Sequence, residues 1–336
     1  MTNPQEATGP PPPVNDSRDS TGSPPAATDP GTSTAPPPPV IDPDLETPRP
    51  PSGEGFSDGV TLAFGDAEAQ LYGLLRVGLA SGTPPRASGL ALLFAGRDLA
   101  AAGAVGAVPV AEPSYAPPEL EEMGIETLEP FARWRARFAG DQGGFSLEVS
   151  ALSPPLTFGD DDPAGKAAAS QGYEQLCLVE GTVRAGGTER PVSCLGQRGH
   201  TWGAPDWDRL ELIRTLSAWL GHDAGLSLAS VRPAKAKAHA DEAVSAFLLE
   251  AVDDGIAARP IADARLSTTY DAAGRQRRAG LELWEHEEAD YPRRASGEVL
   301  CGTSLELGRL RLDCAFFAWN MEGRAGVGRY DVLRRA

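Results

Sequence analysis

From residue 56 onward, short apolar stretches alternate with turns rich in Gly, Asp, Pro and Ser. Such spacing is typical of β-sandwiches and barrels. In one stretch, arginines alternate with Ala132, Trp134 and Phe138, which gives the single wetted face that an antiparallel sheet allows. The sequence contains neither a βαβ rhythm nor a glycine-rich phosphate-binding motif, which argues against nucleotide-binding α/β folds. Strands are predicted at 60–64, 69–79, 89–94, 131–139, 145–151, 174–183, 191–195, 213–220, 226–231, 243–251, 264–270, 277–285, 297–305 and 310–320, with a helical turn at 118–123.

The first fifty residues have a different composition. They hold fifteen of the 31 prolines and no aromatic residue. Such a segment cannot bury enough apolar area to offset its ordering entropy, so we predict a disordered, Pro-rich arm over residues 1–54. The proline runs at 10–13 and 36–39 favour polyproline II and could bind an aromatic groove of a partner; a solubilising tail or spacer is the simpler alternative.

The remaining chain divides at a stretch of weak apolar patterning. Residues 154–172 contain Pro-Pro and Gly-Asp-Asp-Asp-Pro. Because such punctuation marks loops, we interpret this stretch as a linker. The prediction is therefore an all-β protein of two consecutive antiparallel β domains, at 55–153 and 173–336.

Charge and hydropathy restrict the partners. The net charge of −17 argues against nucleic acid, since binding to phosphates needs a basic face, and against anionic membranes. No apolar run reaches the length of a membrane-spanning helix, and the start lacks the pattern of a secretory signal. We expect a cytoplasmic protein.

The four cysteines lack the C-x-x-C spacing of metal and redox sites. If hairpin turns are centred at 185–186 and at 307–308, the cysteines form two cross-strand pairs, close enough for disulfides in favourable cases. The alternative is buried free thiols in a reducing compartment. The two pairs would be Cys177 with Cys194 and Cys301 with Cys314.

One motif concentrates the residues of chemical interest: Gly196-Gln-Arg-Gly-His-Thr-Trp-Gly-Ala-Pro-Asp-Trp207. In a strand, Arg198, His200 and Trp202 share one face. Asp206 could pair with Arg198 or orient His200. Two interpretations stay open: these side chains line a ligand pocket, or they form a closed hydrogen-bonded network that holds strands together, with Trp202 and Trp207 filling the core.

The same motif resembles the G-x-R-D-H-S-W-G-x-R-D-W signature of the AttH-like and carotenoid 1,2-hydratase (hydroxyneurosporene synthase) superfamily. The closing segment, from Glu322 to Tyr330, is similar to that superfamily's E-G-x-x-G-Y-G ending. The resemblance implies two lipocalin-like domains and hydrophobic ligands such as isoprenoids, polyenes or lipids, with activities that include hydration and cyclisation as well as lipid carriage.

One position departs from the signature. Where the superfamily has Asp between Arg and His, this chain has Gly199. An acid there could protonate an alkene or hold the histidine, so its absence weakens the transfer of acid catalysis. The fold transfers more safely than the reaction.

We therefore expect a protein without cofactor or metal that binds a small hydrophobic molecule in a β cavity. As an enzyme it would be a hydratase, cyclase or isomerase that transfers a proton to an alkene. The alternatives are a non-catalytic lipid carrier and a structural or interaction protein that acts through the arm. The proton-transfer candidates are Asp206, His200 and Glu322, and the ligand-binding candidates are Arg198, His200, Trp202, Asp206, Trp207, Trp319 and Tyr330.

Overall fold

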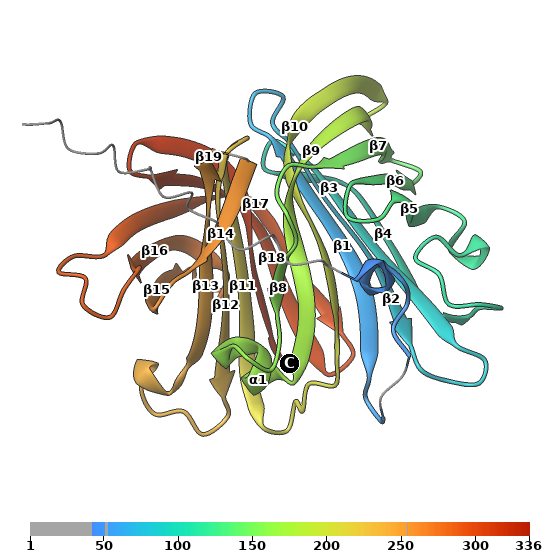
Figure 1. Cartoon of the computed structure of the whole chain (residues 1–336). Coiled ribbons are helices and arrows are strands. Elements are labelled where there is room, and N and C mark those ends of the chain that lie inside the picture. The colour runs from blue at the N-terminus through green and yellow to red at the C-terminus, as the bar shows by residue number, and fades with distance from the viewer. Residues whose placement is uncertain (1–41, 51–52, 254) are drawn as a thin grey trace, which may run out of the picture. The chain divides into compact units, whose positions relative to one another are not determined.

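The computed structural model describes residues 42–50, 53–253 and 255–336, and nearly all of its regular structure is antiparallel β (Figure 1). The all-β prediction is confirmed. The first sheet has ten strands in the order β4-β3-β2-β1-β10-β9-β7-β6-β5, with β8 paired to β9. Its strands are β1 (Ser57–Asp66), β2 (Leu71–Ala80), β3 (Arg86–Ala95), β4 (Asp98–Pro109), β5 (Met123–Glu129), β6 (Arg133–Ala139), β7 (Gly143–Ala151), β8 (Leu156–Phe158), β9 (Ser170–Ala185) and β10 (Thr188–Gly203).

The second sheet has nine strands in the order β14-β13-β12-β11-β19-β18-β17-β16-β15. Its strands are β11 (Leu210–Gly221), β12 (Ala224–Pro233), β13 (Ala243–Val252), β14 (Gly255–Pro260), β15 (Asp263–Tyr270), β16 (Gln276–Trp284), β17 (Arg293–Leu307), β18 (Leu310–Met321) and β19 (Arg324–Arg335). The helical segments are the 3-10 turns η1 (Pro43–Glu46), η2 (Pro118–Leu120) and η3 (His239–Asp241), and the short helix α1 (Pro163–Ala168). None of these described helices has the length and apolarity that crossing a bilayer requires.

Each sheet buries one face in its own core, and the two sheets pack against each other through their opposite faces. In β1, Leu62 and Phe64 lie in the first core, whereas Ala63 between them faces the second sheet. In β18, Phe317 lies in the second core, whereas Phe316 lies between the sheets. Since side chains alternate along a strand, the central strands are apolar on both faces.

The hairpin of β9 and β10 belongs to the first sheet, where it pairs with β7 and β1. The sequence division, which placed residues 173–203 with the second domain, therefore differs from the sheet boundary, which falls between β10 and β11. The physical reason is that β1 needs a partner on its free edge, and β10 provides it over nine paired positions from Ser57 to Gly65. No local pattern in the hairpin reveals this distant partner.

Neither of the two possible cysteine pairs forms, because each hairpin register differs by two residues from the one that the pairing requires. The turn between β9 and β10 consists of Gly186 and Gly187, both at positive φ, so Cys177 pairs with Gly196 instead of Cys194. In the other hairpin, Cys301 pairs with Phe316 and Cys314 with Thr303. All four cysteines are free, and Cys177, Cys301 and Cys314 are buried. The alternative of free thiols in a β core is confirmed.

Candidate functional site

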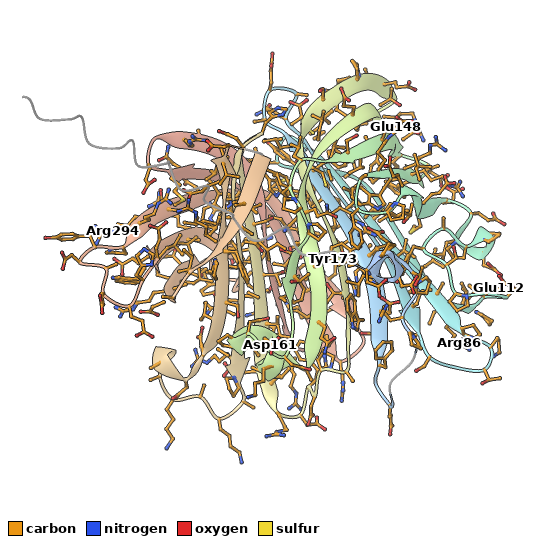
Figure 2. The ribbon with its side chains drawn as sticks, viewed as in Figure 1. Arg86, Glu112, Glu148, Asp161, Tyr173 and Arg294 are labelled. Carbon is orange, nitrogen blue, oxygen red and sulfur yellow. The ribbon has the colours of Figure 1, made fainter. Side chains whose placement is uncertain are left out.

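The motif runs along β10 and its even-numbered side chains point into the core side of the first sheet. Arg198 and His200 are 1% and 0% exposed. His200 and Trp202 have ring centroids 4.9 Å apart. Figure 2 labels Tyr173 in β9, which lies directly opposite His200 in the strand register. The three motif residues therefore share one face, but that face is closed to solvent at Arg198 and His200.

Arg198 is enclosed by aromatic rings and a carboxylate. Its guanidinium carbon lies 4.8 Å from the ring centroid of Trp134 and 5.1 Å from that of Tyr173, at cation–π distance. Its Nη1 and Nη2 donate to the two carboxylate oxygens of Glu46 at 2.9 and 2.7 Å, and Nη1 also donates to the Tyr173 hydroxyl. This bidentate pair is almost fully buried.

The Glu46 carboxylate accepts three further hydrogen bonds from the first sheet. The donors are the indole N–H of Trp134 at 3.2 Å, the backbone N–H of Phe131 at 3.2 Å and the hydroxyl of Thr127 at 3.3 Å. Phe131 adopts a positive φ of 58°, which is uncommon for a residue other than glycine and belongs to the turn before β6. This conformation directs the backbone N–H of Phe131 toward the Glu46 carboxylate.

A second buried cluster joins His200 to Asp58 and Tyr115. The Nε2 atom of His200 lies 2.6 Å from Asp58 Oδ1 and 2.7 Å from the Tyr115 hydroxyl, which also donates to Asp58 Oδ2 at 2.7 Å. The other ring nitrogen, Nδ1, lies 2.7 Å from the carbonyl oxygen of Leu45. Burial, followed by the charge of Asp58 and its hydrogen bond, raises the pKa of Tyr115, so this hydroxyl stays protonated.

These contacts fix residues 42–50 against the first sheet. Leu45 and Glu46 contact His200 and Arg198, respectively. In addition, the backbone N–H of Arg49 donates to Asp58 at 2.8 Å, and the Arg49 guanidinium lies 5.2 Å from the ring centroid of Trp202. The predicted arm over residues 1–54 therefore needs a correction at its end, where buried polar contacts order residues 42–50. Residues 1–41, with both proline runs, lie outside the described residues.

Asp206 and Trp207 do not join Arg198 and His200. Asp206 is exposed, and its carboxylate accepts the backbone N–H of Asp208 at 3.0 Å in the turn before β11. Trp207 is buried in a separate small cluster beside α1. The possible pairing of Asp206 with Arg198 or His200 does not form, because β10 ends at Gly203 and Asp206 lies in the turn that follows.

The remaining candidates lie in the second sheet. Trp319 and Tyr330 pack in its core on either side of Phe317, at centroid distances of 5.6 and 5.4 Å. Glu322, in the turn between β18 and β19, binds Arg293 at 2.7 and 2.9 Å. Hydrogen bonding to Arg293 lowers the pKa of Glu322, so this carboxyl is a poor proton donor.

A cavity of about 340 Å³ lies beside Glu322. Leu248, Leu249 and Met321 give it an apolar floor, while Arg293 and Glu322 lie at its polar side. Its size falls in the lower part of the range of small-molecule pockets.

The opposite face of β10 carries a different set of polar groups, turned toward the second sheet. There Gly199 pairs directly with Glu174 of β9. The Glu174 carboxylate accepts from Gln197 Nε2 at 2.6 Å and from the Ser227 hydroxyl of β12 at 2.5 Å, so it joins the two sheets. A Cβ built on Gly199 would lie 3.4 Å from Glu174 Cγ and 4.0 Å from its Oε1. Glu174 thus places its carboxyl next to the backbone position where the resembled signature has Asp.

Burial raises the pKa of Glu174. The hydrogen bonds from Ser227 and Gln197 and the charge of Arg329 act in the opposite direction and reduce this effect without cancelling it. A carboxyl with a raised pKa holds its proton to higher pH and can donate it. Glu174 is the described carboxyl with a resolved upward shift.

A small cavity of about 10 Å³ adjoins Glu174 between the sheets. Ser217 and Trp219 of β11 line it, and their side-chain Oγ and Nε1 atoms are buried without a hydrogen-bond partner among the described residues. Leu156, Leu176, Leu226 and Leu249 supply apolar walls. Buried polar groups normally have hydrogen-bond partners, so two free donors beside one carboxyl indicate a binding site for a small polar molecule or group. The space matches about one water molecule.

Sequence reasoning missed Glu46, Asp58, Tyr115, Tyr173 and Glu174. For Glu174 a signal existed: Gly186-Gly187 is a typical two-residue hairpin turn, and the register it sets places residue 174 opposite Gly199. For Glu46 and Asp58 no local signal exists, since they lie 152 and 142 positions from their partners.

The fold and the polar site between the sheets define a tandem β protein of lipocalin type. A protein-family model matches residues 42–336, so the chain belongs to the family described as "Domain of unknown function (DUF7064)". In the comparison with curated proteins, no sequence matches the chain.

Two solved structures share the fold. An AttH from Nitrosomonas europaea superposes with a TM-score of 0.55 at 12% identity, covering 82% of this chain and 91% of that one. Kievitone hydratase from Nectria haematococca gives 0.52 at 12% identity, covering 84% and 89%. The resemblance to the AttH-like superfamily is therefore confirmed at the level of the fold.

Proposed function

We propose that this protein is a hydratase- or cyclase-like enzyme that protonates a double bond of a small hydrophobic molecule, with Glu174 as the proton donor. The observation that carries the proposal is the position of Glu174: a carboxyl with a raised pKa, directly opposite Gly199 in the strand pair. The acid that the resembled signature carries on β10 is thus supplied from the neighbouring strand. The fold shared with kievitone hydratase supports the same class of reaction.

The chemistry follows from the groups around the cavity. Glu174 donates its proton to one alkene carbon, which leaves a carbocation at the other. The ring of Trp219 at the cavity wall would stabilise this cation. In a hydratase, a water held by the free Ser217 hydroxyl would add to the cation and return a proton to Glu174. In a cyclase, a second double bond of the substrate would attack the cation and form a carbon–carbon bond, and the new cation would then lose a proton to Glu174.

The cavity must widen to admit a substrate. Its present volume suits a water molecule, and its apolar walls come from both sheets, with Leu176 on β9 and Leu249 on β13. Movement of these walls would enlarge the space without breaking a strand pair, because their side chains meet across the gap between the sheets. Such gating is common in enzymes that exclude water until the substrate binds.

The original candidates take other roles in this proposal. Arg198 and His200 hold residues 42–50 on the far face of β10, and Trp202 covers Arg49. Asp206 caps its own turn, and the ion pair with Arg293 keeps Glu322 ionised. In this proposal, none of these five candidates supplies the proton to the substrate.

The test begins with mass spectrometry of any small molecule that purifies with the protein. That compound, together with kievitone and a panel of prenylated phenolics and polyenes, is then incubated with the protein and followed for gain of one water or for isomerisation. We expect Glu174→Gln to lower turnover at least about a hundredfold, the lower range for loss of a general acid. Glu180→Gln, an exposed carboxylate on the same strand, is the matched control. Equal turnover by Glu174→Gln and the control would contradict the proposal.

A second candidate, a lipid carrier, is favoured by the 340 Å³ cavity beside Glu322. A carrier needs an apolar space and no proton donor. Replacing the exposed Ala251 at this cavity by Trp should displace a carried ligand and leave the Glu174 site intact. For either function we propose a reducing, cytoplasmic setting, which the four free cysteines support.

A further inference from the structure

The group around Arg198 is a receptor for a carboxylate, built entirely by the first sheet and the loop before β6. Its cation is Arg198, held between the rings of Trp134 and Tyr173. The planar guanidinium presents two parallel N–H donors, the geometry that suits a carboxylate. The Phe131 backbone N–H and the Trp134 indole N–H donate to the same carboxylate, the first to Oε1 and the second to Oε2 of Glu46.

The carboxylate bound in this receptor is that of Glu46, which lies on a segment that belongs to neither sheet. Glu46 ends the four-residue turn η1, and its chain has no strand partner. The segment makes contacts at three further points: the carbonyl oxygen of Leu45 with His200, and Arg49 with both Asp58 and Trp202. It therefore binds the sheet as a separate ligand would.

Withdrawal of this segment would leave the receptor complete but empty. Arg198 and the donors around it would then lose the acceptor that Glu46 supplies, which is unfavourable. A free carboxylate is the chemical species that satisfies all of them at once. The buried Glu46 side chain and the half-buried Leu45 would leave together with the segment, so a carboxylate attached to an apolar body of similar size could replace them.

We propose that the Arg198 receptor binds an apolar carboxylic acid, in its ionised form, and that residues 42–50 occupy this site in its absence. This site lies on the core side of β10, opposite the face that carries Gly199 and Glu174. It is therefore separate from the proposed catalytic site, and binding there would release residues 42–50 from the first sheet.

The probe is 3-phenylpropionate, with 3-phenylpropionamide as a control of the same shape without charge. Glu46→Gln keeps the size of the side chain but weakens its hold on Arg198. We expect the half-saturating concentration of 3-phenylpropionate, measured by thermal shift on the full chain, to fall at least about tenfold in this variant, as loss of one charged hydrogen-bonded contact implies. Glu126→Gln, an exposed carboxylate on β5, should behave as the wild type.

Hydrogen exchange locates the binding and does not require the variant to fold. In the wild-type chain, adding 3-phenylpropionate up to its solubility limit should speed hydrogen exchange of the amides of residues 45–49. These include the Arg49 N–H, which donates to Asp58. Unchanged exchange there would overturn the proposal. So would equal binding of the amide, or a Glu46→Gln variant that folds and binds the probe no better than the wild type.

Discussion

At the residue scale, the side chains on the two faces of β10 have different environments. Arg198 and His200 are buried and hydrogen-bonded on the core side, whereas Gly199 leaves room on the side that faces the second sheet. The two glycines of the motif that precede His200 differ in the space around them. A Cβ at Gly199 would make ordinary contacts of 3.4 Å, while one at Gly196 would lie 2.5 Å from the carbonyl oxygen of Ala63.

This difference gives a first prediction. Gly199→Ala should change the free energy of unfolding by less than about 0.5 kcal/mol, as a substitution away from tight packing does. Gly196→Ala should destabilise by about 1–3 kcal/mol, because backbone atoms must shift to admit the methyl group. Urea unfolding of both variants measures the contrast. A large loss of stability in Gly199→Ala would show that the space beside Glu174 is already filled.

A second prediction concerns pH. The folded state raises the pKa of Glu174 above its unfolded value, so the folded state binds the proton more tightly. Its contribution to stability is therefore fully present below the unfolded pKa and is lost as pH rises through the folded pKa. Glu174→Gln carries no such proton, so the stability difference between wild type and variant should fall as pH rises. Urea unfolding from about pH 4 to about pH 8 measures this slope. An opposite slope would mean that Glu174 is held as a carboxylate.

At the element scale, the period-two pattern predicts strands well where apolar and polar residues alternate. It misses the short strands β5, β8 and β14. It also misses β4, whose Ala- and Gly-rich sequence has low strand propensity, and β19, whose glycines and charges resemble a loop. These strands form because neighbours supply pairing partners, β3 for one and both β11 and β18 for the other. The shared face of Arg198, His200 and Trp202 follows from the sequence, whereas their partners depend on how distant strands and η1 come together.

The segment with η1 gives a third prediction. Glu46→Ala should destabilise the protein by about 3–5 kcal/mol, since it leaves Arg198 as a buried charge without its partner. Asp44→Ala, on the exposed side of the same turn, should cost less than about 0.5 kcal/mol. Thermal unfolding of the two variants compares them. Similar midpoints would show that residues 42–50 contribute little to the fold.

At the scale of the whole molecule, the two sheets form one structural unit because a shared apolar layer joins them. Phe316 of β18 contacts Tyr72 and Phe94 of the first sheet at centroid distances of 5.6 and 6.0 Å. Composition and patterning predict two β halves but not which faces meet, since a strand buried on both sides gives no signal of its partner. The proposed catalytic site depends on this contact, because Glu174 and Ser227 come from different sheets.

A fourth prediction tests the shared layer. Phe316→Ala should destabilise by about 3–5 kcal/mol through loss of a fully buried ring. Hydrogen exchange with mass spectrometry should find strands of both sheets losing protection together. Loss of protection in the second sheet alone would show that the sheets fold independently.

The central claim is that a hydrophobic ligand binds between the sheets beside Glu174. The most direct measurement is a crystal structure of the protein with the compound that purifies with it or that it turns over. We predict electron density between β9 and β11, with a double bond or its product within hydrogen-bonding or contact distance of Glu174 and a polar atom on Ser217. A ligand found only in the 340 Å³ cavity beside Glu322 would contradict the claim and favour the carrier.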